Sequence, residues 1–394
     1  MDLTVLDNTK QSILHWKSEC HLLYTSMRIA FRSLSLFVST TSARSVWGLQ
    51  SQVHSQGLAA FAIVPASRGR PFVPFNPSRT SLRMSSASAS GTEGSLRIAL
   101  CQFHVTHNKE ENQATAKDYV DRAAKEGAQM VVLPEIWNSP YATAAFPEYA
   151  ETLPDIGGST PEDVSGSPSS LLLMELARQH QVWLVGGSIP EVVVDPDSKD
   201  RKIYNTCLVF NPQGEVVVKH RKVHLFDIDV PGGIRFKESD TLSPGETVSY
   251  FSTPNANIGV GICYDIRFPE YAMLLRQKHD CAVLVYPGAF NLTTGPAHWE
   301  LLQRGRALDN QCYVVTASPA RSSPPAKGEE SKYPHYSAWG HSTVVSPWGD
   351  VIATTDEKEG LVVADLDLSR VDEVRKSIPI GIQRRTDMYT LDKA

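Results

Sequence analysis

Residues 257–270 read NIGVGICYDIRFPE, and the fold can be worked out from this stretch. Apolar residues alternate with Gly259 and Gly261, which is the pattern of a short buried β-strand. Cys263 continues the phase of the glycines, so we expect the strand to end on this cysteine, with the sulfur on the side that the glycines leave empty. Pro269 suits the first turn of a helix. The stretch therefore predicts strand, turn and helix, with a cysteine where open α/β sheets bind ligands.

Cys263 has two interpretations at this point. Most free cysteines are small buried apolar residues without a chemical role. A nucleophilic thiol needs open space and a base, because at its usual pKa of about 8.5 only a few per cent is thiolate at neutral pH. The glycines favour the open space, and the base has to come from another segment.

The first 92 residues differ in composition from the rest of the 394-residue chain. Residues 21–92 contain no Asp, Glu or Lys, but seven Arg among many Ser. Such a segment cannot form a core and is typical of an organelle transit peptide. We expect residues 1–92 to be this extension, with a chloroplast (plastid) destination favoured over the mitochondrion, and residues 93–394 to form the catalytic domain. A start at Met27 or Met84 is an alternative, and starting at Met84 leaves the protein in the cytosol.

Charge and cysteine usage exclude several classes of function. Residues 1–92 hold nine basic and three acidic residues, which leaves 29 basic against 40 acidic residues in 93–394, a net charge of −11 that argues against nucleic acid as a partner. The six cysteines share no C-x-x-C pairing or metal-type spacing, so we expect no metal, no cofactor and a reducing compartment. No apolar run approaches 18 residues, so we expect no membrane span.

Strand and helix patterns alternate from residue 96 onward. Strands are expected at 96–103, 129–133, 182–185, 202–210, 215–218, 282–286, 312–317, 342–345, 351–354 and 361–364. Helices are expected at 113–126, 170–180, 271–277, 296–310 and 369–376. A polar, proline-bearing loop is expected at 321–336. Hairpins interrupt the parallel pattern, which indicates an α/β layered sandwich rather than a Rossmann sheet.

Three polar residues sit where a strand ends or a loop begins. Glu135 follows the apolar run VVLP, Lys222 ends the basic segment KHRK, and Glu238 lies in the loop GGIRFKES. Each has a simpler explanation, as a helix cap, part of a solvated basic run or a surface residue. Together with Cys263, they would supply a base and a cation for an amide-cleaving thiol without any metal.

Three segments resemble the signature blocks of the nitrilase, or carbon-nitrogen hydrolase, superfamily. They are LPEIWNSPY at 133–141, HRKVHLFDIDVPG at 220–232 and GICYDIRFPE at 261–270. The intervals of 87 and 41 residues between Glu135, Lys222 and Cys263 are ordinary for the Glu-Lys-Cys triad of that superfamily. The resemblance covers residues 96–391.

The resemblance implies a fold, an assembly and a mechanism. The fold is a four-layer αββα sandwich, commonly a homodimer. Glu135 would be the general base and Cys263 the nucleophile that forms a thioester with the substrate. Lys222 and the backbone N–H of Tyr264 would hold the oxyanion, and Glu238 would orient Lys222 and the substrate.

The likeness is greatest to the omega-amidases of the Nit type. It extends through NSPYATAAFPEYAE, YPGAFNLTTGPAHWELLQRGRALDNQ and AWGHSTVVSPWGD. These enzymes hydrolyse the terminal amide of short dicarboxylate monoamides such as 2-oxoglutaramate and 2-oxosuccinamate. Because a buried unpaired anion is costly, the distal carboxylate needs a partner, and we expect Tyr141 and Arg267 to provide it. Arg267 has an alternative role, as an ion-pair partner of Glu270 or Asp265.

Two other classes of function remain open. Carbamoyl-amine amidases, ureidopropionases and aliphatic nitrilases share the triad. A non-catalytic scaffold of the same fold, or a thiol redox sensor, is the alternative from outside enzyme chemistry, and the intact triad speaks against the scaffold.

Overall fold

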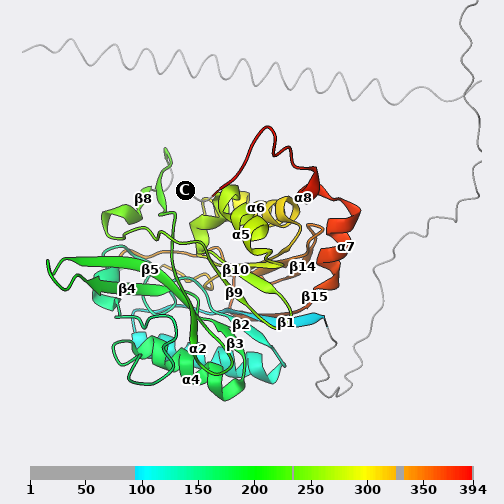
Figure 1. The fold of residues 1–394 in the computed structure, drawn as a ribbon. Coiled ribbons are helices and arrows are strands. Elements are labelled where there is room, and N and C mark those ends of the chain that lie inside the picture. The colour runs from blue at the N-terminus through cyan, green and yellow to red at the C-terminus, as the bar shows by residue number, and fades with distance from the viewer. Residues whose placement is uncertain (1–93, 233–234, 325–331, 393–394) are drawn as a thin grey trace, which may run out of the picture. The chain divides into compact units, whose positions relative to one another are not determined.

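The computed structural model describes residues 94–232, 235–324 and 332–392. The predicted transit peptide at 1–92 and part of the predicted loop at 321–336 lie outside these ranges. Figure 1 shows two β-sheets in the middle of the described part, with α2 and α4 on one outer side and α5 and α6 on the other. The predicted αββα sandwich is therefore confirmed.

The first sheet has the strand order β15-β1-β2-β3-β5-β4, with β6 paired to β5. Its strands are β1 (Ser95–Gln102), β2 (Met130–Val132), β3 (Trp183–Val185), β4 (Ile189–Val194), β5 (Arg201–Phe210), β6 (Val216–Arg221) and β15 (Gly360–Asp367). The second sheet has the order β14-β13-β12-β11-β10-β9. Its strands are β9 (Ser249–Ser252), β10 (Asn257–Val260), β11 (Val283–Pro287), β12 (Tyr313–Ala317), β13 (Thr343–Val345) and β14 (Val351–Thr354).

Helices α2 and α4 pack on the first sheet, and α5 and α6 pack on the second. The described part contains seven α-helices. They are α2 (Lys109–Lys125), α3 (Phe146–Tyr149), α4 (Pro168–His180), α5 (Pro269–His279), α6 (Gly295–Asn310), α7 (Ser369–Ser377) and α8 (Ile380–Gln383). A two-stranded ribbon, β7 (Asp227–Asp229) with β8 (Arg235–Lys237), runs into the 3₁₀ helix η1 (Glu238–Asp240). No helix of the described ranges is long and apolar enough to cross a membrane.

Helix α2 illustrates how the sequence forms one of these layers. Asn108 caps it by accepting a hydrogen bond from the N–H of Glu111 at 2.9 Å. Ala116, Val120 and Ala123 repeat at helical spacing and are buried against the first sheet. The helix begins four residues before the predicted segment 113–126, because the cap lies upstream of the apolar repeat.

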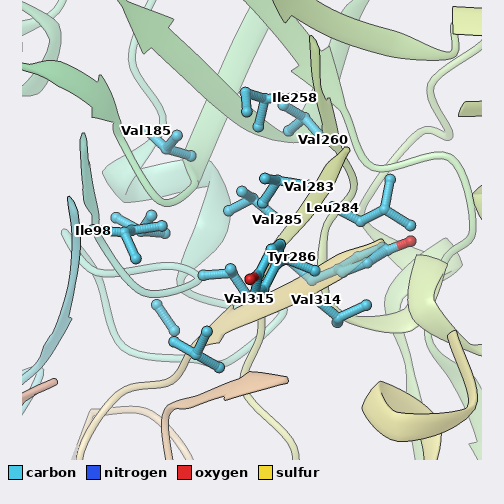
Figure 2. Close-up of a cluster of buried hydrophobic side chains, with 14 of the residues drawn as sticks. Ile98, Val185, Ile258, Val260, Val283, Leu284, Val285, Tyr286, Val314 and Val315 are labelled. Carbon is cyan, nitrogen blue, oxygen red and sulfur yellow. The ribbon is translucent and has the colours of Figure 1, made fainter. Parts of the chain in front are cut away.

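The main core lies between the two sheets. Figure 2 shows Ile98 and Val185 of the first sheet across from Val283 and Val285 of the second, and all four side chains are fully buried. Alternate residues of each strand face this layer, while the opposite faces of the strands pack on the helices. The inner strands are buried on both faces, which explains their nearly continuous apolar runs.

Two expectations about residues 257–263 are wrong. Strand β10 ends at Val260, and Cys263 opens the 3₁₀ helix η2 (Cys263–Arg267) with a left-handed φ of 46°. The space beside Gly261 is not empty either, because a Cβ there would lie 2.5 Å from the Tyr286 ring. The expected helix after Pro269 is confirmed as α5.

Candidate active site

The predicted site residues meet where strands of both sheets end: β2 and β10 have parallel neighbours, whereas β6 pairs antiparallel with β5. Glu135 follows β2, Cys263 follows β10 and Lys222 follows β6, so each side chain is carried by a loop that leaves the central sheets. Glu238 is the first residue of η1. All four side chains are buried, with relative exposures of 4% for Cys263 and 0% for the other three.

The loop that carries Glu135 is held by the turn after β3. The N–H of Ile136 donates to Oγ of Ser188 at 3.1 Å, and the indole N–H of Trp137 donates to the carbonyl of Gly186 at 2.8 Å. Gly187 has a φ of +61°, and a Cβ on it would lie 2.1 Å from the carbonyl oxygen of Pro134. Only glycine permits this approach, so Gly187 lets the turn after β3 pack closely against the loop that carries Glu135.

The Lys222 ammonium joins the two carboxylates. Its Nζ donates to Oε1 of Glu135 at 3.0 Å and to Oε1 of Glu238 at 2.9 Å. Oε2 of Glu238 accepts from the N–H of Phe226 at 2.8 Å. Two buried negative charges therefore surround one buried positive charge, and each group has hydrogen-bond partners in place of water.

Glu135 is held through both of its oxygens. Oε1 accepts from Nδ2 of Asn205 at 2.9 Å as well as from Lys222, and Oε2 accepts from the N–H of Ala289 at 2.8 Å. The thiol of Cys263 lies close enough to Glu135 for the two groups to shift each other's pKa. The carboxylate thus lies between the ammonium and the sulfur, where a base has to be.

Burial and charge set the protonation of the site. Burial raises the pKa of Glu135, and the positive charge of Lys222 only partly opposes this. Burial and then the charge of Glu135 raise the pKa of the Cys263 thiol well above its usual value. For Lys222, burial alone would lower the pKa, but the two carboxylates outweigh it and raise the pKa. The resting site therefore holds an ammonium and a protonated thiol, with the proton acceptor beside the sulfur.

Tyr141 lies in the site, but its hydroxyl is already engaged. It donates to Oε1 of Glu238 at 2.9 Å and lies 3.2 Å from Oε1 of Glu135. Its ring stacks on Tyr336 with centroids 4.5 Å apart, and both rings line a cavity of about 40 Å³ beside Glu135. A cavity of this volume accommodates about one water molecule.

Arg267 is the last residue of η2, four positions after Cys263. Its guanidinium is 5.5 Å from the centroid of the Tyr264 ring and 4.7 Å from that of Phe290, and Nη1 lies 3.2 Å from Nδ1 of His298. Nε is buried without a hydrogen-bond partner. Among the described residues no carboxylate pairs with this side chain, so the alternative of an ion pair with Glu270 or Asp265 is wrong.

Tyr264 is the second residue of η2. The first N–H groups of a helix have no acceptor within the helix, so the N–H of Tyr264 is available beside the sulfur-bearing residue. The close approach of residue 288 keeps this region compact, because a Cβ on Gly288 would lie 3.3 Å from Cα of Cys263.

Sequence reasoning missed several residues of the site. Asn205 could have been noticed, since it is an amide side chain in the middle of a predicted strand, and it is fully buried. The N–H of Ala289 and the ring of Tyr336 gave no signal, because a backbone group has no residue type and Tyr336 lies in a polar loop. In the described ranges no group of three or more His, Cys, Asp or Glu side chains is arranged to hold a metal ion.

Comparison with known proteins adds to this geometry. The model of the family described as Carbon-nitrogen hydrolase matches residues 97–376. Omega-amidase NIT2 of Xenopus tropicalis is 54% identical over 297 residues, which are 75% of this chain and 98% of the relative. Omega-amidase NIT2 of Homo sapiens is 49% identical over 298 residues, 76% of this chain and 98% of the relative. The crystal structure of Saccharomyces cerevisiae Nit3, a member of branch 10 of the nitrilase superfamily, has a TM-score of 0.63 and 41% identity, and covers 76% of this chain and 100% of that chain.

Proposed function

The chain belongs to the carbon-nitrogen hydrolase family, and we propose that within this family it is an omega-amidase. Its substrates would be short dicarboxylate monoamides such as 2-oxoglutaramate and 2-oxosuccinamate, and its products 2-oxoglutarate or oxaloacetate and ammonia. The observation that carries this proposal is the buried cluster in which Glu135 lies between the thiol of Cys263 and the ammonium of Lys222. Relatives at 49–54% identity with the name omega-amidase support the choice within the family.

The first half of the reaction acylates the enzyme. As the sulfur of Cys263 adds to the amide carbon, its proton passes to Glu135, and the oxyanion is held by Lys222 and the N–H of Tyr264. Glu135 then gives the proton to the leaving nitrogen, the C–N bond breaks, and ammonia departs from a thioester.

The second half hydrolyses the thioester. Glu135 takes a proton from water, and the oxygen of that water adds to the thioester carbon. The C–S bond breaks, the sulfur regains a proton from Glu135, and the carboxylic acid product ionises. Glu135 alone accepts and returns each proton, which agrees with a pKa that burial raises above its usual value.

Arg267 is the group we propose for the distal carboxylate. It is a half-buried cation close to Cys263, held by two aromatic faces, and its Nε has no partner. A guanidinium in this state is stabilised by an anion that brings acceptors with it. Tyr141 is the second candidate. Because its hydroxyl donates to Glu238, a contact with substrate requires that hydrogen bond to be shared.

The decisive experiment measures ammonia release from a matched panel. The panel contains 2-oxoglutaramate and 2-oxosuccinamate, a carbamoyl amine, a ureido acid and an aliphatic nitrile. An omega-amidase releases ammonia from the two monoamides without carbon dioxide. Carbon dioxide from the carbamoyl compounds, or turnover of the nitrile alone, would assign the chain to one of the sister activities instead.

We also propose a homodimer, supported by exposed apolar side chains on and beside α6. Leu308 is 51% exposed and Trp348 46% exposed, and Leu308 packs next to Gly349 in the turn that carries Trp348. Exposed apolar patches of this kind mark interaction surfaces. Light scattering should give the mass of a dimer for the wild type and of a monomer for Leu308→Glu, whereas Ile156→Glu, a matched exposed apolar residue elsewhere, should stay dimeric.

The chloroplast destination of residues 1–92 remains a proposal. It rests on the arginine- and serine-rich, acid-poor composition of residues 21–92. A fusion of residues 1–92 to a fluorescent protein should enter plastids. Mitochondrial fluorescence would select the alternative organelle, and cytosolic fluorescence would reject the targeting proposal.

A further inference from the structure

Asp265 is a fully buried carboxylate two residues after the cysteine, and the reaction described above does not use it. It lies in η2, which carries Cys263 at its start. A buried carboxylate is costly unless its oxygens are hydrogen-bonded, so its partners show what the residue is for.

Four donors saturate the carboxylate. Oδ2 accepts from the N–H of Ile262 at 2.9 Å and lies 3.3 Å from Nε2 of His220. Oδ1 accepts from the N–H of His224 at 2.9 Å and lies 2.8 Å from Nδ1 of the same residue. Since an ionised carboxylate only accepts, both ring nitrogens act as donors. Burial alone would raise the pKa of Asp265, but the hydrogen bonds from the two histidines more than offset it, so the pKa is lowered.

These donors come from the two segments that carry the catalytic groups. Ile262 immediately precedes Cys263, while His220 and His224 each lie two residues from Lys222. The carboxylate of Asp265 therefore connects the turn that carries Cys263 with residues on both sides of Lys222. Both histidine rings have further contacts: the ring of His224 stacks on Phe268, which follows η2, with centroids 3.7 Å apart, and Nδ1 of His220 lies 3.0 Å from Oγ of Ser249.

We propose that Asp265 is a positioning residue that sets the placement of the Cys263 sulfur relative to Lys222 and Glu135. Cys263 needs such support because its backbone is in the left-handed region, with φ at 46°, a conformation that costs free energy for any residue other than glycine. The hydrogen bond from Ile262 to Asp265 holds the turn closed just before this residue. The two histidine contacts then fix that turn to the lysine-bearing segment.

Asp265→Asn is the direct test, because it keeps the shape and removes the charge. The amide side chain of asparagine cannot accept hydrogen bonds from both backbone N–H groups and both histidine rings, so at least one of these four contacts is lost. A displacement of about 1 Å at a reacting atom costs up to about 100-fold in rate, and we expect kcat per folded enzyme to fall about 10- to 100-fold with KM nearly unchanged. Asp121→Asn is the matched control. It removes another histidine–carboxylate contact, 2.7 Å from His180, on the helices outside the site.

His224→Gln is a second variant, which tests the proposal even if Asp265→Asn does not fold. The His224 side chain is 27% exposed, so it is not part of the fully buried core. It should lower kcat in the same direction. The double variant Asp265→Asn with His224→Gln should lose no more than the worse single variant, since both changes open the same link. Losses that multiply would mean that the two residues act separately and would overturn the proposal.

The inference rests on the proposed amidase reaction, so a readout without substrate accompanies the kinetics. Alkylation of Cys263 by iodoacetamide, followed by peptide mass, should slow in Asp265→Asn and His224→Gln, but not in Asp121→Asn. If the wild type hydrolyses no amide while alkylation slows as expected, the amidase assignment fails and the positioning role stands. If Asp265→Asn keeps the wild-type kcat and alkylation rate and loses only thermal stability, Asp265 is a structural ion and the inference is wrong.

Discussion

Nζ of Lys222 lies 2.9 Å from Oε1 of Glu238, and neither side chain is exposed to solvent. The lysine already has Glu135 as a counter-ion, so Glu238 adds a second negative charge to a closed site. The extra charge helps to raise the pKa of Lys222, which favours its ammonium form, and it also helps to raise the pKa of Glu135.

Glu238→Gln should change both the rate and its pH dependence. After burial, the charge of Glu238 is a further cause that raises the pKa of Glu135, and Lys222 opposes it. Glu135 has to be ionised to take a proton, so activity falls as the pH drops below this pKa. Removing the neighbouring negative charge lowers the pKa, and the acid limb of the kcat/KM profile should move to lower pH. The maximum rate should fall about 100-fold, as for the loss of one oxyanion contact. An acid limb that moves to higher pH would contradict the electrostatic role.

Cys263→Ala should reduce ammonia release to the buffer rate while far-UV circular dichroism and the melting temperature stay close to wild type. The substitution removes one buried sulfur and leaves the backbone, so only the nucleophile is lost. Cys281→Ala is the control, because it removes another buried free thiol in the core outside the site. Measurable turnover by Cys263→Ala would rule out the thioester route.

Arg267→Met should affect amide substrates differently, according to whether they carry a distal carboxylate. A charge-assisted hydrogen bond contributes about 1.5–3 kcal/mol, so KM for a monoamide with a distal carboxylate should rise about 10- to 100-fold. KM for a neutral amide of the same length should stay unchanged. Arg276→Met, which removes an arginine paired with Asp280 at 2.8 Å, should affect neither substrate. Equal losses on both substrates would argue against a carboxylate contact.

Leu100→Ala should lower the free energy of unfolding by about 2–5 kcal/mol, the usual cost of a large-to-small substitution in a packed core. Leu100 is fully buried on β1 in the layer between the two sheets. Ile382→Ala, at a side chain that is 88% exposed, should change it by less than about 0.5 kcal/mol. Urea unfolding of the three proteins measures both effects, and equal midpoints would show that the inter-sheet layer contributes little.

Local periodicity predicted much of the fold. The strands at 96–103 and 312–317 and the helices at 170–180 and 296–310 are present within a few residues of the expected bounds. Strand β4 and the ribbon of β7 and β8 were not predicted. The segments of β7 and β8 are only three residues long, so neither offers enough residues for a period of two to be recognised.

The residues of the site were predicted from the sequence, but the contacts between them were not. Glu135, Lys222, Glu238 and Cys263 lie together as the resemblance implied, although 128 residues separate the first from the last. The left-handed backbone of Cys263 and the Tyr286 ring beside Gly261 contradicted the expected open strand end. The alternation of residues along a strand shows which of them lie on the same face. It does not show which side chain of a neighbouring strand fills the space beside a glycine.

The sequence by itself determined the alternation of strands and helices and the acidic character of residues 93–394, because these are properties of residue type and near neighbours, and its resemblance to the carbon-nitrogen hydrolases singled out Cys263, Glu135 and Lys222. Only the tertiary structure decided that Tyr141 donates to Glu238, that Arg267 has no carboxylate partner and that Asp265 connects the turn of Cys263 to His220 and His224. Hydrogen bonds of this kind join residues that are 41 to 97 positions apart in the chain, and they form only after the sheets bring those segments together.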